Sequence, residues 1–145
     1  MKIAICVDKS NGILFSGRRL SQDSILRNKL LELMENGKLF MNEYSAKQFD
    51  ESEKLEVFED FLLKASDNDI CFVENVDVPM DQVSELYLFN WNRDYPADTY
   101  FEFNPKDSGF KRIRKEEFVG SSHKKITLEV YRRVWKWKEV LILFV

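Results

Sequence analysis

The chain has 145 residues, a length typical of one domain, and 44% of them are hydrophobic, which is enough for a packed core. A formal net charge of −3 gives no basic excess, so we expect no nucleic-acid partner. The longest apolar run, at residues 140–145, is too short to cross a bilayer, and the N-terminal apolar run ends at Asp8, too early for a signal peptide. The two cysteines, Cys6 and Cys71, lie in apolar runs and are expected as reduced, buried thiols, so we expect a cytoplasmic protein without a membrane partner.

The first two thirds of the chain alternate between patterns typical of strands and of helices. Short apolar runs predict buried strands at residues 2–7, 38–41, 69–74 and 85–91. Helical patterns cover residues 21–37, 43–49 and 57–65. In the first helix, Ser21 is the expected cap, Asp23 lies in the first turn and Gly37 ends the helix. The acidic segment 50–56 is predicted to be a surface connection.

From residue 98 onward the chain alternates apolar and polar residues, as antiparallel strands with one exposed face do. These strands are expected at residues 99–103, 110–118 and 124–133. The Gly-Ser-Ser stretch at 120–122 predicts a hairpin turn, and His123, the sole histidine, is expected at the corner of that hairpin rather than in catalysis. The fold class predicted for residues 1–145 is a single α/β domain with a mixed central sheet, flanking helices and a C-terminal antiparallel hairpin.

Residues 134–145, VWKWKEVLILFV, form an extra C-terminal strand or tail in this prediction. Two tryptophans and a closing apolar run make the segment too apolar to remain in solvent. It is expected either to pack on the sheet, to fill the core, or to pair with a second subunit or another protein.

Several motifs resemble dihydrofolate reductase in a shortened form. MKIAICVDKSNGILF resembles that family's first strand and the D-x-x-x-G-I turn, and LSQD resembles its LPxD at the head of the first helix. SELYLFNWNRDYPADTYFEF is similar to LYLT…GDT-x-FP, and GSSHKKITLEVYRR is similar to the closing S-H-x-Y-x-F-x-I-x-x-R hairpin. The resemblance implies a reduced dihydrofolate reductase-like fold.

The sequence departs from the family where the dinucleotide would bind. The family has a Gly-Gly pair after the strand at 69–74, and this chain has Glu74-Asn75, whose carboxylate would block close backbone approach and repel phosphate. After the strand at 38–41, the family's Gly-Arg is replaced by Asn42-Glu43. The segment between the second helix and the strand at 69–74 is also short. We therefore expect no NADPH-dependent catalysis, no cofactor and no metal, and a role as a binding or regulatory module.

Asp23 is the one catalytic candidate. The resemblance implies that an acid here hydrogen-bonds the pterin ring and supports its protonation, whereas the residue pattern and the missing cofactor features favour an acid that stabilises a helix N-terminus. Together with Arg18 and Arg19, Asp23 forms the predicted ligand-binding set for an unknown small molecule or protein.

Enzymatic alternatives remain open. One is a divergent reductase of pterin or nucleotide-related substrates that uses Asp23. Another is a phosphoesterase, because NGILFSGRR together with NRDYPAD resembles short bacterial proteins named ribonuclease Z; the genuine metallo-hydrolase, however, needs a cluster of His and Asp around two zinc ions. Asp94, Asp98 and Glu102 could hold a hard cation. Ser-His-Asp hydrolysis, in contrast, is not favoured by the sequence: folding would have to bring a serine and an acid to His123, the adjacent Ser121 and Ser122 belong to the turn, and there is no G-x-S-x-G elbow.

Overall fold

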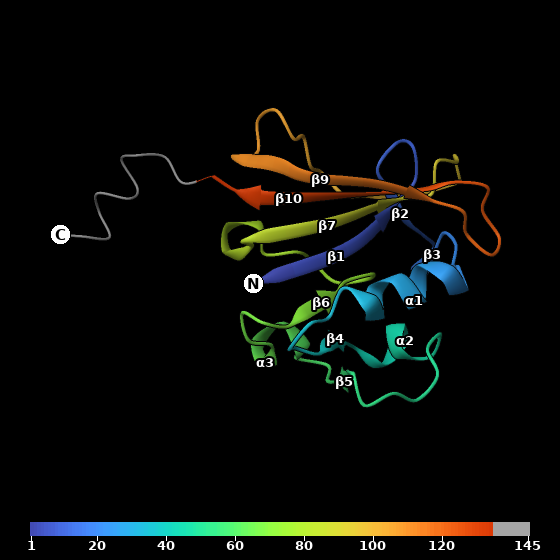
Figure 1. The fold of residues 1–145 in the computed structure, drawn as a ribbon. Helices are drawn as coiled ribbons and strands as arrows, with labels where there is room; N and C mark the ends of the chain where they lie inside the picture. Colours follow the sequence, from blue (N-terminus) through green and yellow to red (C-terminus); the bar gives the residue numbers. More distant parts are fainter. Residues whose placement is uncertain (135–145) are drawn as a thin grey trace.

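The computed structural model describes residues 1–134, in which a seven-stranded sheet forms the centre of the molecule (Figure 1). Its strand order is β5-β4-β6-β1-β7-β10-β9. The bounds are β1 Lys2–Val7, β4 Leu39–Met41, β5 Leu55–Val57, β6 Ile70–Phe72, β7 Glu85–Asn90, β9 Phe110–Phe118 and β10 Ile126–Arg133. The strands from β5 to β7 pair in parallel, and β10 and β9 close the sheet as an antiparallel hairpin. The mixed α/β fold and the C-terminal hairpin are as predicted.

Smaller elements surround this sheet. The helices are α1 Ser24–Glu32, α2 Glu43–Ala46, α3 Phe61–Lys64 and the 3-10 turn η1 Met80–Gln82. A second, three-stranded sheet consists of β2 Gly12–Phe15 between β3 Arg18–Arg19 and β8 Thr99–Tyr100. This small sheet replaces the longer strand expected at 99–103, of which only Thr99 and Tyr100 pair.

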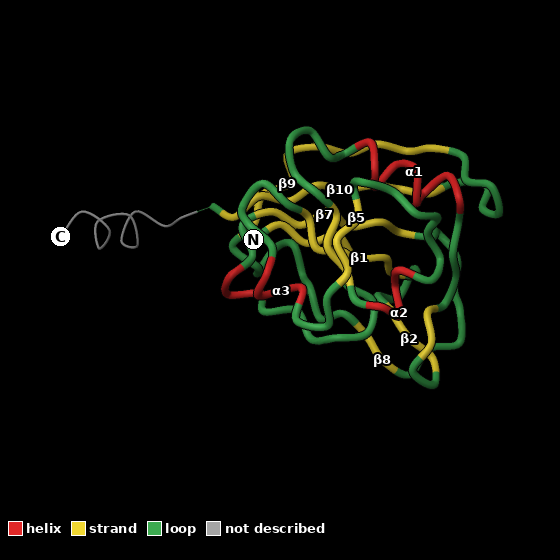
Figure 2. Tube along the Cα trace, turned by 90° about the horizontal axis from the view of Figure 1, so that it is seen from below, coloured by secondary structure: helices red, strands yellow, loops and turns green. Residues whose placement is uncertain are grey.

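The core lies on both faces of the large sheet because side chains alternate along β1. Ile3 and Ile5 belong to a cluster that includes Phe61 of α3, whereas Ala4 packs on the other face with Leu26 of α1. Figure 2, seen from below, shows α1 on one side of the strands and α3 on the other. The carboxyl end of β1 therefore emerges between the layers, beside the start of α1.

The first helix is shorter than predicted and its cap is a different residue. α1 begins after Asp23, whose side chain accepts hydrogen bonds from the backbone N–H groups of Ile25 and Leu26. Asp23 is therefore the N-cap, a position where Asp and Ser are both favoured, and the expected capping by Ser21 is wrong. The helix ends at Glu32 with Leu33 as the C-cap, so Gly37 lies beyond it.

The segment 50–65 also differs from its prediction. The expected helix at 57–65 is reduced to α3, and Leu55–Val57, partly assigned to a connection, form the edge strand β5. β5 forms through long-range pairing: it runs parallel to β4, with Leu55 opposite Leu39 and Val57 opposite Met41. The hydrogen bonds gained between the two strands override the local helical pattern.

The predicted C-terminal tail at 134–145 lies outside the described residues, apart from Val134, whose N–H donates to the carbonyl of Gly109. Among residues 1–134, no helix has both the length and the apolar character needed to cross a membrane.

Candidate functional site

The candidate site centres on the carboxylate of Asp23, whose side chain is fully buried. Its Oδ1 atom accepts the N–H groups of Ile25 and Leu26 at 2.9 and 3.2 Å, which fixes it to the first turn of α1. The same oxygen accepts the N–H of Ser121 at 3.0 Å, from the turn before β10. Asp23 therefore joins the start of α1 to a turn almost a hundred residues later in the chain.

The second carboxylate oxygen faces that turn. Oδ2 accepts the backbone N–H of Ser122 at 2.9 Å and its hydroxyl at 3.2 Å. It also lies 2.9 Å from Nδ1 of His123. With six donors from its own chain, Asp23 has no unoccupied acceptor direction in the described structure. A direct contact with a ligand would require Asp23 to release one of these donors.

These bonds set the charge of Asp23. Burial alone would raise the pKa of this carboxyl, but hydrogen bonds from the Ser122 backbone, His123, Ser121 and Leu26 outweigh it and hold the pKa well below its usual range. Asp23 is consequently ionised at every pH at which the protein is expected to work.

His123 lies just after the predicted turn, and its side chain is buried. That side chain is only 2% exposed and its ring stacks on that of Trp91, with the centroids 4.5 Å apart. Its Nε2 atom lies 3.0 Å from the hydroxyl of Ser21 and 2.9 Å from that of Tyr95. Folding thus does bring both a serine and an acid to the histidine.

Arg19 belongs to a separate ion-paired cluster. Its guanidinium contacts both carboxylate oxygens of Glu74, at 2.9 and 3.1 Å, and lies over the ring of Tyr44, 4.3 Å from the centroid. The amide of Gln48 donates to the same carboxylate at 2.9 Å. Burial would lower the pKa of Arg19, but the bonds to Glu74 outweigh it and raise that pKa, so the guanidinium keeps its charge.

The three predicted ligand-binding residues are not bonded to one another. Asp23 and Arg19 have different partners, and Arg18 is exposed on β3 with no ion pair to any residue of the described part. The charges of both clusters nevertheless act on the thiol of Cys6 in β1. Burial raises the pKa of that thiol first, and the charges of Glu74 and Asp23 raise it further while Arg19 lowers it.

Two asparagines join the ends of β4 and β6, where the resemblance implies glycines. The side-chain Nδ2 of Asn42 donates to Oδ1 of Asn75 at 2.8 Å. The side-chain Oδ1 of Asn42 accepts the backbone N–H of Ser45, which makes Asn42 the N-cap of α2. Both side chains therefore stand between strand ends that a dinucleotide-binding protein keeps open for phosphate.

The other acids weighed from the sequence act in turns. Asp98 accepts the N–H of Ser16 at 2.9 Å, and Asp94 lies 3.3 Å from the hydroxyl of Ser10. Within residues 1–134, no three His, Cys, Asp or Glu side chains gather as metal ligands would.

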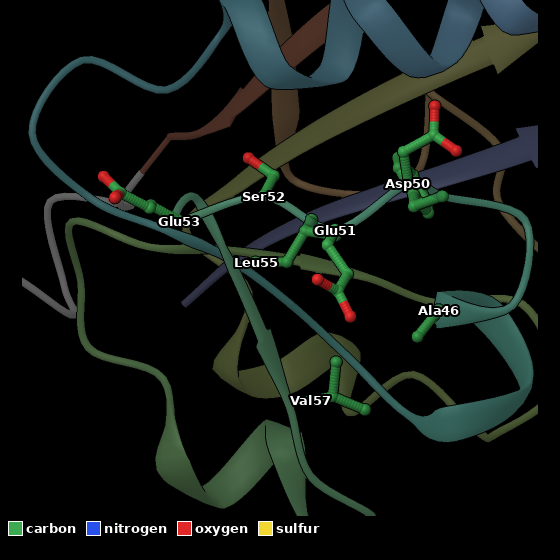
Figure 3. Close-up of a pocket in the computed structure, with 8 residues that line it drawn as sticks. Ala46, Asp50, Glu51, Ser52, Glu53, Leu55 and Val57 are labelled. Atoms are coloured by element: carbon green, nitrogen blue, oxygen red, sulfur yellow. The ribbon is translucent and has the colours of Figure 1, made fainter.

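A pocket of about 520 Å³ lies away from these clusters, beside the edge strand β5 (Figure 3). Apolar side chains contributed by α2, β5 and the intervening loop meet the acidic loop residues there. Its lining is Ala46, Phe49, Asp50, Glu51, Ser52, Glu53, Leu55 and Val57. It contains none of the predicted site residues, because the sequence indicated only a connection at this position.

Comparison with protein-family models and with curated proteins found no match. Among solved structures, the chain is similar to dihydrofolate reductase from Enterococcus faecalis, determined in complex with NADP(H) and RAB-propyl, with a TM-score of 0.62 and 15% identity. The similarity covers 92% of this chain and 96% of that one. The chain has a dihydrofolate reductase-like fold. The fold implied by the sequence motifs is thereby confirmed.

Sequence reasoning selected Asp23 but missed its partners. The pairing of Asp23 with His123, and of His123 with Ser21 and Tyr95, spans up to 102 residues of chain. No local sequence pattern predicts such contacts. The available signal was that LSQD and GSSH each place polar residues directly before an apolar helix or strand pattern.

Proposed function

We propose that this protein uses a dihydrofolate reductase-like fold as a binding module that does not perform NADPH-dependent reduction. The observation that carries the proposal is the Arg19–Glu74 pair. Glu74 stands where the resemblance implies the first glycine of the cofactor turn, and its side chain is only 8% exposed while it accepts both arms of Arg19.

The electrostatics of that position oppose a dinucleotide. A diphosphate approaching the end of β6 would meet a carboxylate instead of free backbone N–H groups. Moving Glu74 aside would break two charge-assisted hydrogen bonds to Arg19 and one from Gln48. The Asn42–Asn75 contact adds a second side-chain link across the neighbouring strand ends.

The ligand of this module, in our proposal, is an anionic small molecule or an acidic segment of a partner protein. Arg18 is exposed on the face of β3 opposite to Arg19, and in our proposal it adds positive charge near an anion that competes with Glu74 for Arg19. Asp23 would hold the turn at 120–123 in place rather than contact that anion. We also propose a reducing, cytoplasmic setting and a regulatory role; the free thiols of Cys6 and Cys71 support the setting.

The test is a titration with NADPH followed by nicotinamide fluorescence, with the Enterococcus faecalis enzyme as the positive control. We expect no saturable change at micromolar NADPH. Glu74→Gly, which removes the carboxylate, and Glu53→Gly, an exposed loop control, separate the effect of charge at this position from a general effect of losing a glutamate. Saturable binding by the unmodified protein would overturn the proposal.

A further inference from the structure

Three side chains lie in the order that nucleophilic hydrolases use. The Ser21 hydroxyl is 3.0 Å from Nε2 of His123, and Nδ1 of the same ring is 2.9 Å from Oδ2 of Asp23. This is the serine–histidine–carboxylate arrangement that recurs on unrelated folds and is recognised by its geometry rather than by sequence position.

We propose that Ser21 is an activated nucleophile toward carboxylic esters, with His123 as its general base and Asp23 as the residue that positions His123. The proposal goes beyond the binding function above and is independent of it, because neither Arg19 nor Glu74 takes part. A protein that binds no NADPH can still transfer an acyl group.

The exposure of the three residues suits these roles. Asp23 has a fully buried side chain, the His123 side chain is 2% exposed, and Ser21 is partly exposed. The acid and the base are therefore shielded from water, while the nucleophile is within reach of a substrate. Stacking on Trp91 holds the imidazole plane.

The carboxylate also fixes the tautomer of the histidine. Asp23 is ionised and can only accept, so the proton of a neutral His123 resides on Nδ1 and the lone pair of Nε2 faces Ser21. That orientation is the one in which the ring can remove the proton of the serine hydroxyl.

Tyr95 supplies a second hydroxyl at the same nitrogen, 2.9 Å from Nε2. The single lone pair of Nε2 accepts one hydrogen at a time. When Ser21 donates to it, the Tyr95 hydroxyl is released to donate elsewhere. A substrate carbonyl beside Ser21 would then have a phenolic donor for its developing negative charge, which is the role of oxyanion-stabilising side chains.

Ser21 Oγ forms a bond to the ester carbonyl carbon while its proton moves to Nε2 of His123. The bond from that carbon to the alcohol oxygen then breaks, and the alcohol leaves with the proton from Nε2. Water attacks the acyl-serine by the same proton transfers, which releases the carboxylic acid and restores the hydroxyl of Ser21.

The experiment uses a fluorophosphonate probe on the full chain, with intact mass and peptide mapping as readouts. We expect one adduct per chain, located on Ser21, absent in Ser21→Ala and unchanged in Ser24→Ala. Ser24 is the matched control because it is exposed one residue beyond the cap, and its hydroxyl has no hydrogen-bond partner in the described structure. With p-nitrophenyl acetate, we expect a burst of about one p-nitrophenol per chain that Ser21→Ala abolishes.

If the three residues had only a structural role, Ser21 would form no adduct. Absence of any Ser21 adduct on the folded protein, under conditions that label chymotrypsin, would overturn the proposal. So would a folded Asp23→Asn protein, judged by circular dichroism, that still labels at the original rate, because loss of the positioning acid is expected to slow labelling on the order of 10⁴-fold. Since the Ser21→Ala change leaves Asp23 and His123 in place, it tests the proposal even if Asp23→Asn fails to fold.

Discussion

Replacing Asp23 with asparagine tests the network around it. The amide oxygen can still accept the two N–H groups of α1, but the NH₂ group then faces the three donors that Oδ2 now accepts. The Ser122 hydroxyl can turn to accept, and His123 can change tautomer. The backbone N–H of Ser122, however, is left facing another donor inside the protein.

The magnitude follows from those contacts. An unsatisfied buried N–H costs about 1–3 kcal/mol, and the loss of a charge-assisted bond to His123 costs about 1.5–3 kcal/mol. We expect Asp23→Asn to lower the free energy of unfolding by about 3 kcal/mol, near the lower end of the sum of these two costs. Urea unfolding followed by tryptophan fluorescence measures this. Asp67→Asn, an exposed control, should stay within about 0.5 kcal/mol. A loss below about 1 kcal/mol for Asp23→Asn would refute the described bonding.

The same pair of proteins has a predicted pH dependence. The pKa of Asp23 is lower in the folded protein than in the unfolded chain, where an aspartate titrates near about 4. The stabilisation is therefore fully present above about pH 5 and is lost as the pH falls below about 4 toward the folded pKa. The stability gap between the protein and Asp23→Asn should narrow as the pH falls from about 4 toward the folded pKa of Asp23. A gap that widens in acid would contradict this sign.

Three further predictions concern the surroundings of this site. Glu74→Ala should lower the free energy of unfolding by about 1–2 kcal/mol, measured in urea, because the partly buried Arg19 loses its partner. Gly120→Ala should cost about 1–3 kcal/mol by the same assay, because its Cβ would lie 2.3 Å from Oδ2 of Asp23. The half-buried thiol of Cys6 should react with Ellman's reagent more slowly in the folded protein than in the unfolded chain at the same alkaline pH, since desolvation raises its pKa; equal rates in the two states would contradict this shift.

The large sheet could be predicted because its strands are local apolar runs. KIAICV and ELYLFN carry enough β-branched and aromatic side chains to identify β1 and β7, and the family motifs supplied their order. β5 could not be predicted, since three residues with little burial become a strand only through pairing with β4.

The candidate site divides in the same way. Asp23 could be predicted from the sequence because LSQD precedes a helical pattern. Glu74 could be singled out because it stands where the family resemblance implies a glycine. The Arg19–Glu74 pair and the burial of His123 depend on segments that are distant in the sequence. The residues flanking each of these side chains therefore predict neither the ion pair nor the burial. His123 was therefore assigned to a hairpin corner.

The central claim is that this dihydrofolate reductase-like fold works without nicotinamide chemistry. The most direct measurement is the loss of NADPH absorbance in the presence of dihydrofolate and the purified protein, with the Enterococcus faecalis enzyme run in parallel. We predict a rate equal to the blank without protein. NADPH consumption that requires both dihydrofolate and this protein, and that disappears in Asp23→Asn, would contradict the account.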